Sequence, residues 1–375
     1  MNFDDLTKYI RSLPDNQIPG IDLMVFHQGK EVYRCMNGTC DYLRRKSVSP
    51  DTRYYIYSMT KPITMTAVMQ CVERGEIWLE DYVANYIPAF SDMKVLEKDG
   101  TVRPAKKKIK IKHLLSMTSG LDYRLDSPSR LEAMRDPMLT TEKFINAVAA
   151  DPLRFEPGTK YKYSLSHDVA ARVVEVVTGK TFGEYLQEHI FAPLGMNDTT
   201  FRETPAIRRN LAAQFRRDDV KDKIYPIDFR NGFVVSQAYE SGGAGLITST
   251  EDYGKFVSAM STAFHDEHPI LGQAAIELMR TPQVSDEILE GEFSKFEQGY
   301  SYGLGVRTMK YPEKAGAKSP VGEFGWDGAA GSVSFIDPDN QIAMVYLIQV
   351  GRSKFSYFTL FPEVRDKIYD ILLNS

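Results

Sequence analysis

Two serines in this 375-residue chain are each followed three residues later by a lysine: Ser58 by Lys61, and Ser91 by Lys94. On a helix this spacing places both side chains on one face, where the lysine can help to remove the proton of the serine hydroxyl. A serine activated in this way can form a covalent acyl intermediate. The spacing by itself is weak evidence, because short pairs of common residues also arise by chance.

The surroundings of the two serines differ. Ser58 follows the aromatic, β-prone run 53–57 and precedes an apolar helical segment, which predicts a strand-to-helix junction. A helix N-terminus stabilises a developing oxyanion, and Pro62 suits the first turn of that helix. Ser91 stands in a polar stretch that predicts a solvated loop. Ser58 is therefore the candidate nucleophile, and the alternative is that it only caps the helix.

Lys61 needs an environment that changes its acidity. Lysine and tyrosine have ordinary pKa values near 10, and neither is a base at pH 7 without a fall of roughly 3 pH units, about 4 kcal/mol. A shared cleft can supply this, because burial destabilises an ammonium and an ammonium stabilises a phenolate, and the two groups would titrate as a pair. Tyr163 is the candidate partner, since segment 156–165 combines a Pro-Gly turn with the start of a helix. Tyr161 is its rival.

Other kinds of site have little support. The chain has no GxSxG elbow, no P-loop and no GxGxxG motif. Its six histidines are scattered; His265 and His268 lie close together but lack metal-site spacing, which favours a surface loop. Without an evident histidine base, a Ser-His-Asp hydrolase is not indicated. The basic run 106–112 alternates lysine with isoleucine after its first residues and predicts a solvated strand face rather than a nucleic-acid site.

The elements that must position these residues divide into two groups. Apolar, β-rich runs lie near both ends of the chain, at 21–26, 31–35, 332–336 and 342–348, next to amphipathic helices at 3–13 and 364–372. They predict an α+β fold with one antiparallel sheet flanked by terminal helices. Helical periodicity dominates between 59 and 260, which predicts an inserted, mainly helical lobe. We expect one catalytic unit over 1–375, with an α/β lobe of about 1–60 and 240–375, a helical lobe of about 61–239, and a cleft between them.

The ordered set of motifs resembles a known family. Ser58-x-x-Lys61, Tyr163-Ser164-Leu165 and Trp326-Asp327-Gly328 resemble the three active-site motifs of the class C β-lactamases and penicillin-recognising serine hydrolases, in order and at about the family's spacing. The chain also resembles this family at stretches 74–79, 111–121, 155–159, 193–196 and 242–246. The resemblance therefore covers nearly the whole chain. It implies a β-lactamase/transpeptidase-like fold.

Two departures from the family pattern are informative. Leu165 stands where the β-lactamases have an asparagine that contacts the substrate amide, and Trp326 stands where they have a lysine that attracts the substrate carboxylate. A site without the asparagine and the lysine gains no binding energy from an amide or a carboxylate on the substrate. The combination is similar to the family VIII carboxylesterases and their acyltransferase relatives. It predicts an apolar cleft and a substrate that needs no negative charge.

The resemblance also implies roles. Ser58 would be the acyl-accepting nucleophile, with Tyr163 and Lys61 as coupled base and proton shuttle. The backbone N–H groups of Ser58 and Ala329 would form the oxyanion hole. Substrate contacts would come from Trp326, Gly328 and Leu165.

The expected function is a serine carboxylesterase that hydrolyses short-chain or aryl esters, with no metal and no organic cofactor. The alternatives are an acyltransferase, a β-lactamase or D-amino-acid peptidase, and a non-catalytic ligand-binding module.

Composition narrows the partners and the location. A hydrophobic fraction of 43% against 26% charged residues excludes a disordered chain, and 46 basic against 50 acidic residues provide no global field for nucleic acid or an anionic membrane. The acidic start predicts no signal peptide, and no run approaches the ~20 apolar residues of a membrane span. Three cysteines without a metal motif favour a reduced, cytoplasmic protein; the alternative is a Cys35–Cys40 disulfide in an exported one. The expected partner is a small-molecule ester, and the oligomeric state stays open.

Overall fold

A seven-stranded antiparallel sheet forms the base of the molecule. The computed structural model describes residues 1–227, 230–267, 269–290, 293 and 298–373. The strand order is β2-β1-β13-β12-β11-β10-β9. Strands from the two ends of the chain are therefore neighbours at the β1–β13 pair, where Leu23 faces Tyr346, and the expected sheet is confirmed. The strands are β1 (Gly20–His27), β2 (Lys30–Gly38), β9 (Tyr300–Tyr302), β10 (Arg307–Met309), β11 (Phe324–Asp327), β12 (Val333–Asp337) and β13 (Ile342–Leu347).

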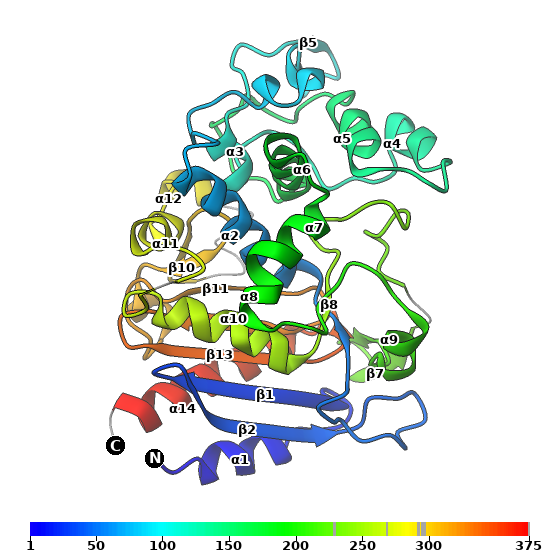
Figure 1. The fold of residues 1–375 in the computed structure, drawn as a ribbon. Coiled ribbons are helices and arrows are strands. Elements are labelled where there is room, and N and C mark those ends of the chain that lie inside the picture. Colours follow the sequence, from blue (N-terminus) through cyan, green and yellow to red (C-terminus); the bar gives the residue numbers. More distant parts are fainter. Residues whose placement is uncertain (228–229, 268, 291–292, 294–297, 374–375) are drawn as a thin grey trace.

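Helices cover both faces of this sheet. The terminal helices α1 (Asp4–Arg11) and α14 (Phe361–Leu373) lie on one face, and α10 (Thr250–Thr262) lies on the other (Figure 1). Side chains along β1 alternate between these layers: 23 and 25 belong to the core beside the terminal helices, and 24 and 26 to the core beside α10. Because both faces are buried, β1 is mainly apolar along its length instead of alternating; its buried Asp22 pairs with Arg34 of β2.

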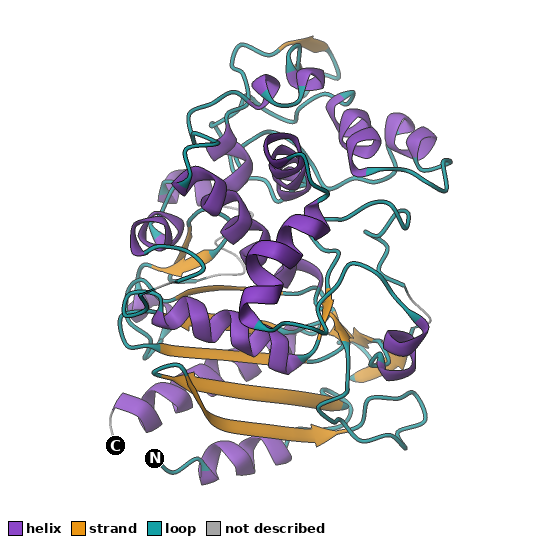
Figure 2. Cartoon of the chain, viewed as in Figure 1, coloured by secondary structure: helices purple, strands orange, loops and turns teal. Residues whose placement is uncertain are grey.

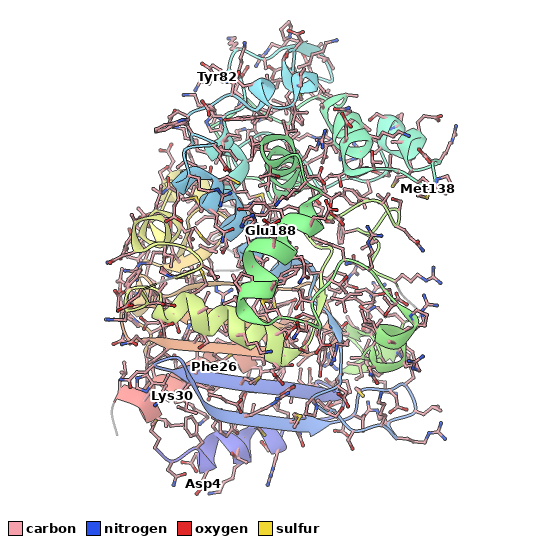
Figure 3. All side chains as sticks on the ribbon, in the orientation of Figure 1. Asp4, Phe26, Lys30, Tyr82, Met138 and Glu188 are labelled. Atoms are coloured by element: carbon pink, nitrogen blue, oxygen red, sulfur yellow. The ribbon has the colours of Figure 1, made fainter. Side chains whose placement is uncertain are left out.

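The layer between the sheet and α10 is closely packed. Phe26 projects from β1 into this layer (Figure 3), and a Cβ atom on Gly254 of α10 would lie 2.7 Å from its ring. A glycine at this position of α10 therefore allows the aromatic ring to lie directly against the helix backbone.

Most of the remaining helices gather on the α10 side of the sheet (Figure 2). Helix α2 (Thr60–Glu73) leads from the sheet into this region, packs against α6 (Ser166–Thr178), and is buried from Thr60 to Cys71. The proposed division at 60 and 240 stays a prediction, although every strand of the main sheet lies outside 61–239. The other α-helices are α3 (Ile111–Leu115), α4 (Pro128–Ala133), α5 (Thr141–Ala149), α7 (Phe182–Leu186), α8 (Ala192–Leu194), α9 (Pro205–Asn210), α11 (Gln273–Arg280), α12 (Asp286–Leu289) and α13 (Pro312–Ala315).

The helical middle of the chain also contains strands that the sequence did not predict. Two hairpins lie there, β4 (Lys94–Leu96) with β5 (Val102–Pro104), and β6 (Phe215–Asp218) with β7 (Lys223–Pro226). These strands are short, and β4, β5 and β7 are largely exposed; β6 alternates in burial, but one of its two buried residues is Arg217, so none shows the alternating apolar pattern of a half-buried strand. Two further short strands, β3 (Tyr54–Tyr55) and β8 (Ile247–Thr248), pair with each other, and β14 (Val350–Gly351) runs parallel to β6.

The basic run at 106–112 is not a strand face, so that expectation was wrong. Residues 106–107 form a bend, Lys110 forms an isolated β-bridge with Tyr82, and the run then enters α3. The backbone N–H groups of Lys106 and Lys107 donate to the Glu156 carboxylate, and the ammonium groups of Lys110 and Lys112 pair with Glu80. Contacts with residues distant in sequence therefore decide the conformation of this segment.

Three further expectations concern the cysteines, a membrane-spanning helix and the loop with two histidines. Cys35, Cys40 and Cys71 are all buried and free, so the disulfide alternative is not formed. Within the described ranges, no helix combines the length and the apolar character that crossing a membrane requires. His268, which belongs to the predicted histidine loop, lies outside the described residues.

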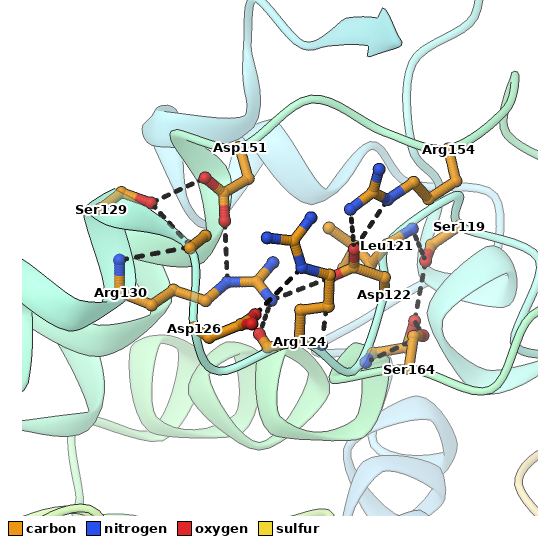
Figure 4. A network of polar contacts seen from close by, with 12 residues as sticks. Ser119, Leu121, Asp122, Arg124, Asp126, Ser129, Arg130, Asp151, Arg154 and Ser164 are labelled. Atoms are coloured by element: carbon orange, nitrogen blue, oxygen red, sulfur yellow. Dashed lines mark hydrogen bonds and ion pairs between the residues drawn. The ribbon is translucent and has the colours of Figure 1, made fainter. Parts of the chain in front are cut away.

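A buried ionic network supports the wall next to the proposed cleft (Figure 4). Arg130 is 1% exposed; its Nη1 donates to Asp122 Oδ1 at 2.9 Å, and its Nε lies 2.9 Å from Asp151 Oδ2. Arg154 Nε donates to the other oxygen of Asp122 at 2.7 Å. Burial would raise the pKa of the Asp122 carboxyl, but hydrogen bonds from Arg154 and Arg130 outweigh it and hold that pKa below its usual value. The network fixes Asp122, and thereby the residue that follows it, Tyr123.

Truncating the centre of this network should destabilise the fold. We expect Arg130→Ala to lower the free energy of unfolding by roughly 3 to 5 kcal/mol, because two buried carboxylates lose their shared counter-ion. Urea denaturation measures this loss. The control is Arg135→Ala, whose pair with Glu132 is largely exposed and should contribute at most about 1 kcal/mol. Equal losses in the two variants would contradict the prediction.

Candidate active site

Ser58 lies in a strained turn between β3 and α2. The 3₁₀ turn Tyr57–Met59 connects the two elements, in agreement with the predicted strand-to-helix junction. Tyr57 has a φ of 46°, a left-handed conformation that costs a non-glycine residue about 1 to 3 kcal/mol. The Tyr57 hydroxyl donates to Gln214 Oε1 at 2.6 Å, so a residue distant in sequence stabilises this turn. The N-cap of α2 is Met59, so Ser58 is not a simple helix cap.

The structure brings Ser58, Lys61 and Tyr163 together. Lys61 Nζ donates to Ser58 Oγ at 3.1 Å, and Tyr163 Oη donates to the same oxygen at 2.8 Å. The rival Tyr161 packs its ring against Phe293 and Tyr302 instead. The second serine of the sequence pattern, Ser91, is exposed, and its hydroxyl donates to the Pro88 carbonyl.

Burial gives Lys61 and Tyr163 opposite shifts in acidity. Burial of the ammonium lowers the pKa of Lys61 to about 7, although the carboxylates of Asp168 and Asp327 act in the other direction. Burial raises the pKa of Tyr163 above its usual value, and hydrogen bonds with Ser58 and Trp326 offset this only in part. Near pH 7 a neutral amine is therefore available at Lys61, whereas Tyr163 remains a phenol that can donate a proton.

An aromatic stack holds Tyr163 in place. The ring of Tyr163 lies between Tyr123, at a centroid distance of 5.4 Å, and Trp326, at 5.9 Å. Trp326 Nε1 donates to Tyr163 Oη at 3.3 Å, and Lys61 Nζ lies 4.6 Å from the centroid of the Tyr163 ring. Trp326 is 6% exposed, and its ring also packs edge-on against Tyr302, at a centroid distance of 5.3 Å. The sequence analysis missed Tyr123, because no local pattern shows that residue 123 will reach the lysine.

The other predicted binding residues lie in different environments. Leu165 is 2% exposed, belongs to the main core and is not among the described residues that line the cleft, so its contact with a substrate stays a prediction. A Cβ atom on Gly328 would lie 2.4 Å from the Ile56 carbonyl oxygen, so this glycine allows the end of β11 to pack against the chain that enters the Ser58 turn. Ala329 follows immediately and lines the same cleft as Ser58.

The cleft has a volume of about 1020 Å³, and its lining includes Ser58, Tyr123, Tyr163, Phe233 and Ala329. This is the size of a site for a small organic molecule. Among the described residues, no group of three or more histidine, cysteine, aspartate or glutamate side chains is arranged to bind a metal ion.

A second network positions the Lys61 amine, and the sequence analysis missed it as well. Asp168 of α6 is 1% exposed, and its Oδ1 accepts hydrogen bonds from Tyr239 Oη at 2.6 Å, Ser241 Oγ at 2.6 Å and Gly243 N at 3.3 Å. The carbonyl of Gly243 in turn accepts from Lys61 Nζ at 2.7 Å. Asp168 therefore acts on Lys61 through the 239–243 loop and through its own charge.

Comparison with known proteins defines the class of this protein. The family model described as Beta-lactamase matches residues 6–366, so the chain belongs to this family. The fold is accordingly β-lactamase/transpeptidase-like, as the motifs predicted.

The relatives include esterases and acyltransferases. Esterase EstB of Burkholderia gladioli is 26% identical, over 96% of this chain and 93% of its own. ML-236A carboxylate methylbutanoyltransferase mlcH of Penicillium citrinum is 31% identical, over 72% of this chain and 68% of its own. Among solved structures, "EstCE1, a hydrolase with promiscuous acyltransferase activity" superposes with a TM-score of 0.81 at 26% identity, covering 98% of this chain and 97% of that one. This chain is therefore a member of a family that contains both serine hydrolases and acyltransferases.

Removing the Asp168 charge should make Lys61 more acidic. The carboxylate raises the pKa of the nearby ammonium, so Asp168→Asn should move that pKa below its value of about 7 and increase the fraction of neutral amine at lower pH. The rate at which a fluorophosphonate labels Ser58, measured from pH 5 to 9, should rise with pH, and its midpoint should shift to lower pH in the variant. The control is Asp126→Asn, an exposed carboxylate paired with Arg124. A midpoint that is unchanged or raised in Asp168→Asn would contradict the assignment.

Proposed function

We propose that this protein is a serine carboxylesterase that hydrolyses short-chain or aryl esters through an acyl-enzyme on Ser58. One observation carries the proposal: Ser58 Oγ lies within hydrogen-bond distance of both Lys61 Nζ and Tyr163 Oη. A nucleophile with a base and an acid in contact is the arrangement that acyl transfer to serine requires. The esterase among the relatives supports the same reaction.

Acylation follows from the acidities of the two partners. The neutral amine of Lys61 accepts the Ser58 proton as Oγ forms a bond to the ester carbonyl carbon. The carbonyl oxygen then carries a negative charge, which the backbone N–H groups of Ser58 and Ala329 would stabilise by about 3 to 4 kcal/mol per donor. When the carbon–oxygen bond to the alcohol breaks, the Tyr163 phenol donates a proton to the leaving oxygen. Tyr163 then recovers a proton from the Lys61 ammonium, and both groups return to their starting states.

Deacylation repeats these steps with water. Lys61 accepts a proton from the water molecule as its oxygen attacks the acyl carbon, and Ser58 Oγ leaves with a proton from Tyr163. The products are the carboxylic acid and free Ser58, so the atoms of one water molecule account for the hydrolysis. In this mechanism Trp326 is a positioning residue, because it holds Tyr163 Oη through its indole N–H.

The proposal predicts a large loss of activity when Ser58 is changed. We expect Ser58→Ala to lower kcat/KM for p-nitrophenyl butyrate by a factor of about 10⁴ to 10⁶, as in other serine hydrolases without their nucleophile. We expect Tyr163→Phe, which keeps the ring and removes the hydroxyl, to lower kcat/KM for ethyl butyrate by about 10² to 10⁴, because an alkoxide needs a proton in order to leave. Intact-mass spectrometry should detect a butyryl group on the wild-type protein and none on Ser58→Ala.

Ser91→Ala is the matched control, because Ser91 belongs to the second serine–lysine pair and is exposed outside the cleft. It should retain wild-type activity. Full activity in Ser58→Ala, or an acyl group located on another residue, would overturn the proposal. A stable adduct with a cephalosporin but not with the ester would favour the β-lactamase alternative, and no adduct with either would favour the binding module.

An acyltransferase is the second candidate, and the size of the cleft favours it. A volume of about 1020 Å³ exceeds the needs of a short ester and leaves room for an alcohol that competes with water. The relatives include a transferase and a hydrolase, which supports an alcohol or water as the acyl acceptor.

The acceptor can be identified from the product ratio. With p-nitrophenyl butyrate and a millimolar alcohol such as 1-butanol, an esterase should yield mainly butyric acid, because water is present in large excess and the site has no built preference for the alcohol. Chromatography measures the acid and the new ester, while nitrophenolate release measures total acylation. The control is the same reaction with the boiled protein. Ester as the main product at millimolar alcohol would show that the acyltransferase is the correct assignment.

A further inference from the structure

A second hollow opens beside the candidate active site. It has a volume of about 690 Å³ and shares Phe233 and Ala329 with the main cleft. Because Ala329 is also the proposed oxyanion-hole residue, a substrate bound at Ser58 can extend into this space. Its lining includes two arginines, Arg216 and Arg352, and among the residues that the structure describes it contains no aspartate or glutamate.

The sheet places these two arginines next to each other. Strands β6 and β14 pair in parallel, and their register aligns Arg216 with Gly351, the residue before Arg352. Both arginines are exposed. Arg352 has a φ of 61°, so its backbone is held in the left-handed region at the edge of the hollow.

Within the described parts of the chain, neither guanidinium group takes part in a hydrogen bond or an ion pair. The neighbouring Arg217 is different, since it is buried and pairs with Asp219 and Asp222. Arg216 and Arg352 therefore keep their donors available to a molecule in the hollow. A guanidinium group is suited to this role because its fork of N–H donors matches the oxygen atoms of a carboxylate or a phosphate.

The main cleft adds to this local positive charge. Among the described residues that line it, Arg124, Arg154, Lys160 and Lys162 are basic and Asp122 is acidic; Asp122 binds Arg154 and the buried Arg130, and Arg124 pairs with Asp126. The whole chain has a net charge of −4, so the cations around Ser58 are a local concentration and not a general property of the surface. Such a concentration attracts anionic ligands and speeds their association.

We propose that the natural substrate is an ester with a carboxylate or phosphate group, and that Arg216 and Arg352 bind this anion while the ester carbonyl lies at Ser58. The inference rests on the proposed function and specifies its substrate class. It also revises the expectation of a substrate without a negative charge. The tryptophan at position 326 shows only that the anion is not bound where the β-lactamases bind theirs, and the arginines offer a different position.

The test compares charged and neutral esters of similar size. The probes are 4-acetylphenyl butyrate as the neutral ester, 4-carboxyphenyl butyrate and the butyrate ester of hydroquinone monophosphate as the two anionic esters, and the monoaryl ester of glutaric acid to place a carboxylate on the acyl side. In the wild-type protein at least one anionic ester should have the higher kcat/KM. In Arg216→Ala/Arg352→Ala the ratio of anionic to neutral kcat/KM should fall by about tenfold or more, mainly through KM.

The control is Arg45→Ala/Arg135→Ala, which removes the same charge from exposed positions outside both hollows; it should preserve the ratio. Raising the salt concentration should lower the preference in the wild type, as expected for attraction between exposed charges. The preferred probe identifies carboxylate or phosphate as the anion. If the wild type does not prefer an anionic ester, or if both double variants lose the ratio equally, the inference about the anion is overturned and the proposed function is unaffected. Absence of any ester turnover together with no fluorophosphonate label on Ser58 would instead overturn the proposed function.

Discussion

The burial of one ammonium group is the constraint on which the site depends. Lys61 is fully buried, and an unpaired ammonium in such a place loses the hydration that stabilises its charge. The surrounding groups provide limited compensation: the Gly243 carbonyl, the Ser58 hydroxyl and the more distant Asp168 carboxylate. This balance brings the pKa of Lys61 to about 7, where an amine can both accept and return a proton.

Several distant segments must meet for this balance to exist. The turn before α2 carries Ser58 and the first turn of α2 carries Lys61, α6 carries Asp168 and begins just after Tyr163, and β11 contributes Trp326. Two glycines permit the close approach: Gly328 lies against the chain entering the Ser58 turn, and Gly243 lies against Asp168. A methyl group at either position would separate the elements by tenths of an ångström or more, and the hydrogen bonds at Ser58 leave little room for that.

The roles of the motif residues differ in part from those that the family resemblance implied. In the proposed mechanism Tyr163 is a proton donor instead of one half of a coupled base, because burial raises its pKa while it lowers that of Lys61. Leu165 belongs to the core, and Trp326 positions Tyr163. The polar recognition that these two positions provide in the β-lactamases is absent here, and the charges available to a substrate lie around the rim of the cleft instead.

The sequence by itself determined the sheet from the two termini, the strand-to-helix junction at Ser58 and the three motif positions, because these depend on local periodicity and on spacing along one helix. It did not show the exposed hairpins at β4–β5 and β6–β7, whose short strands carry no apolar alternation. Only the tertiary structure decided that Tyr123 and Asp168 lie close to Lys61, that Leu165 belongs to the core, and that Arg216 and Arg352 line one hollow. Each of these relations joins residues from separate segments, and burial, charge and hydrogen bonding between such segments exist only after the chain has folded.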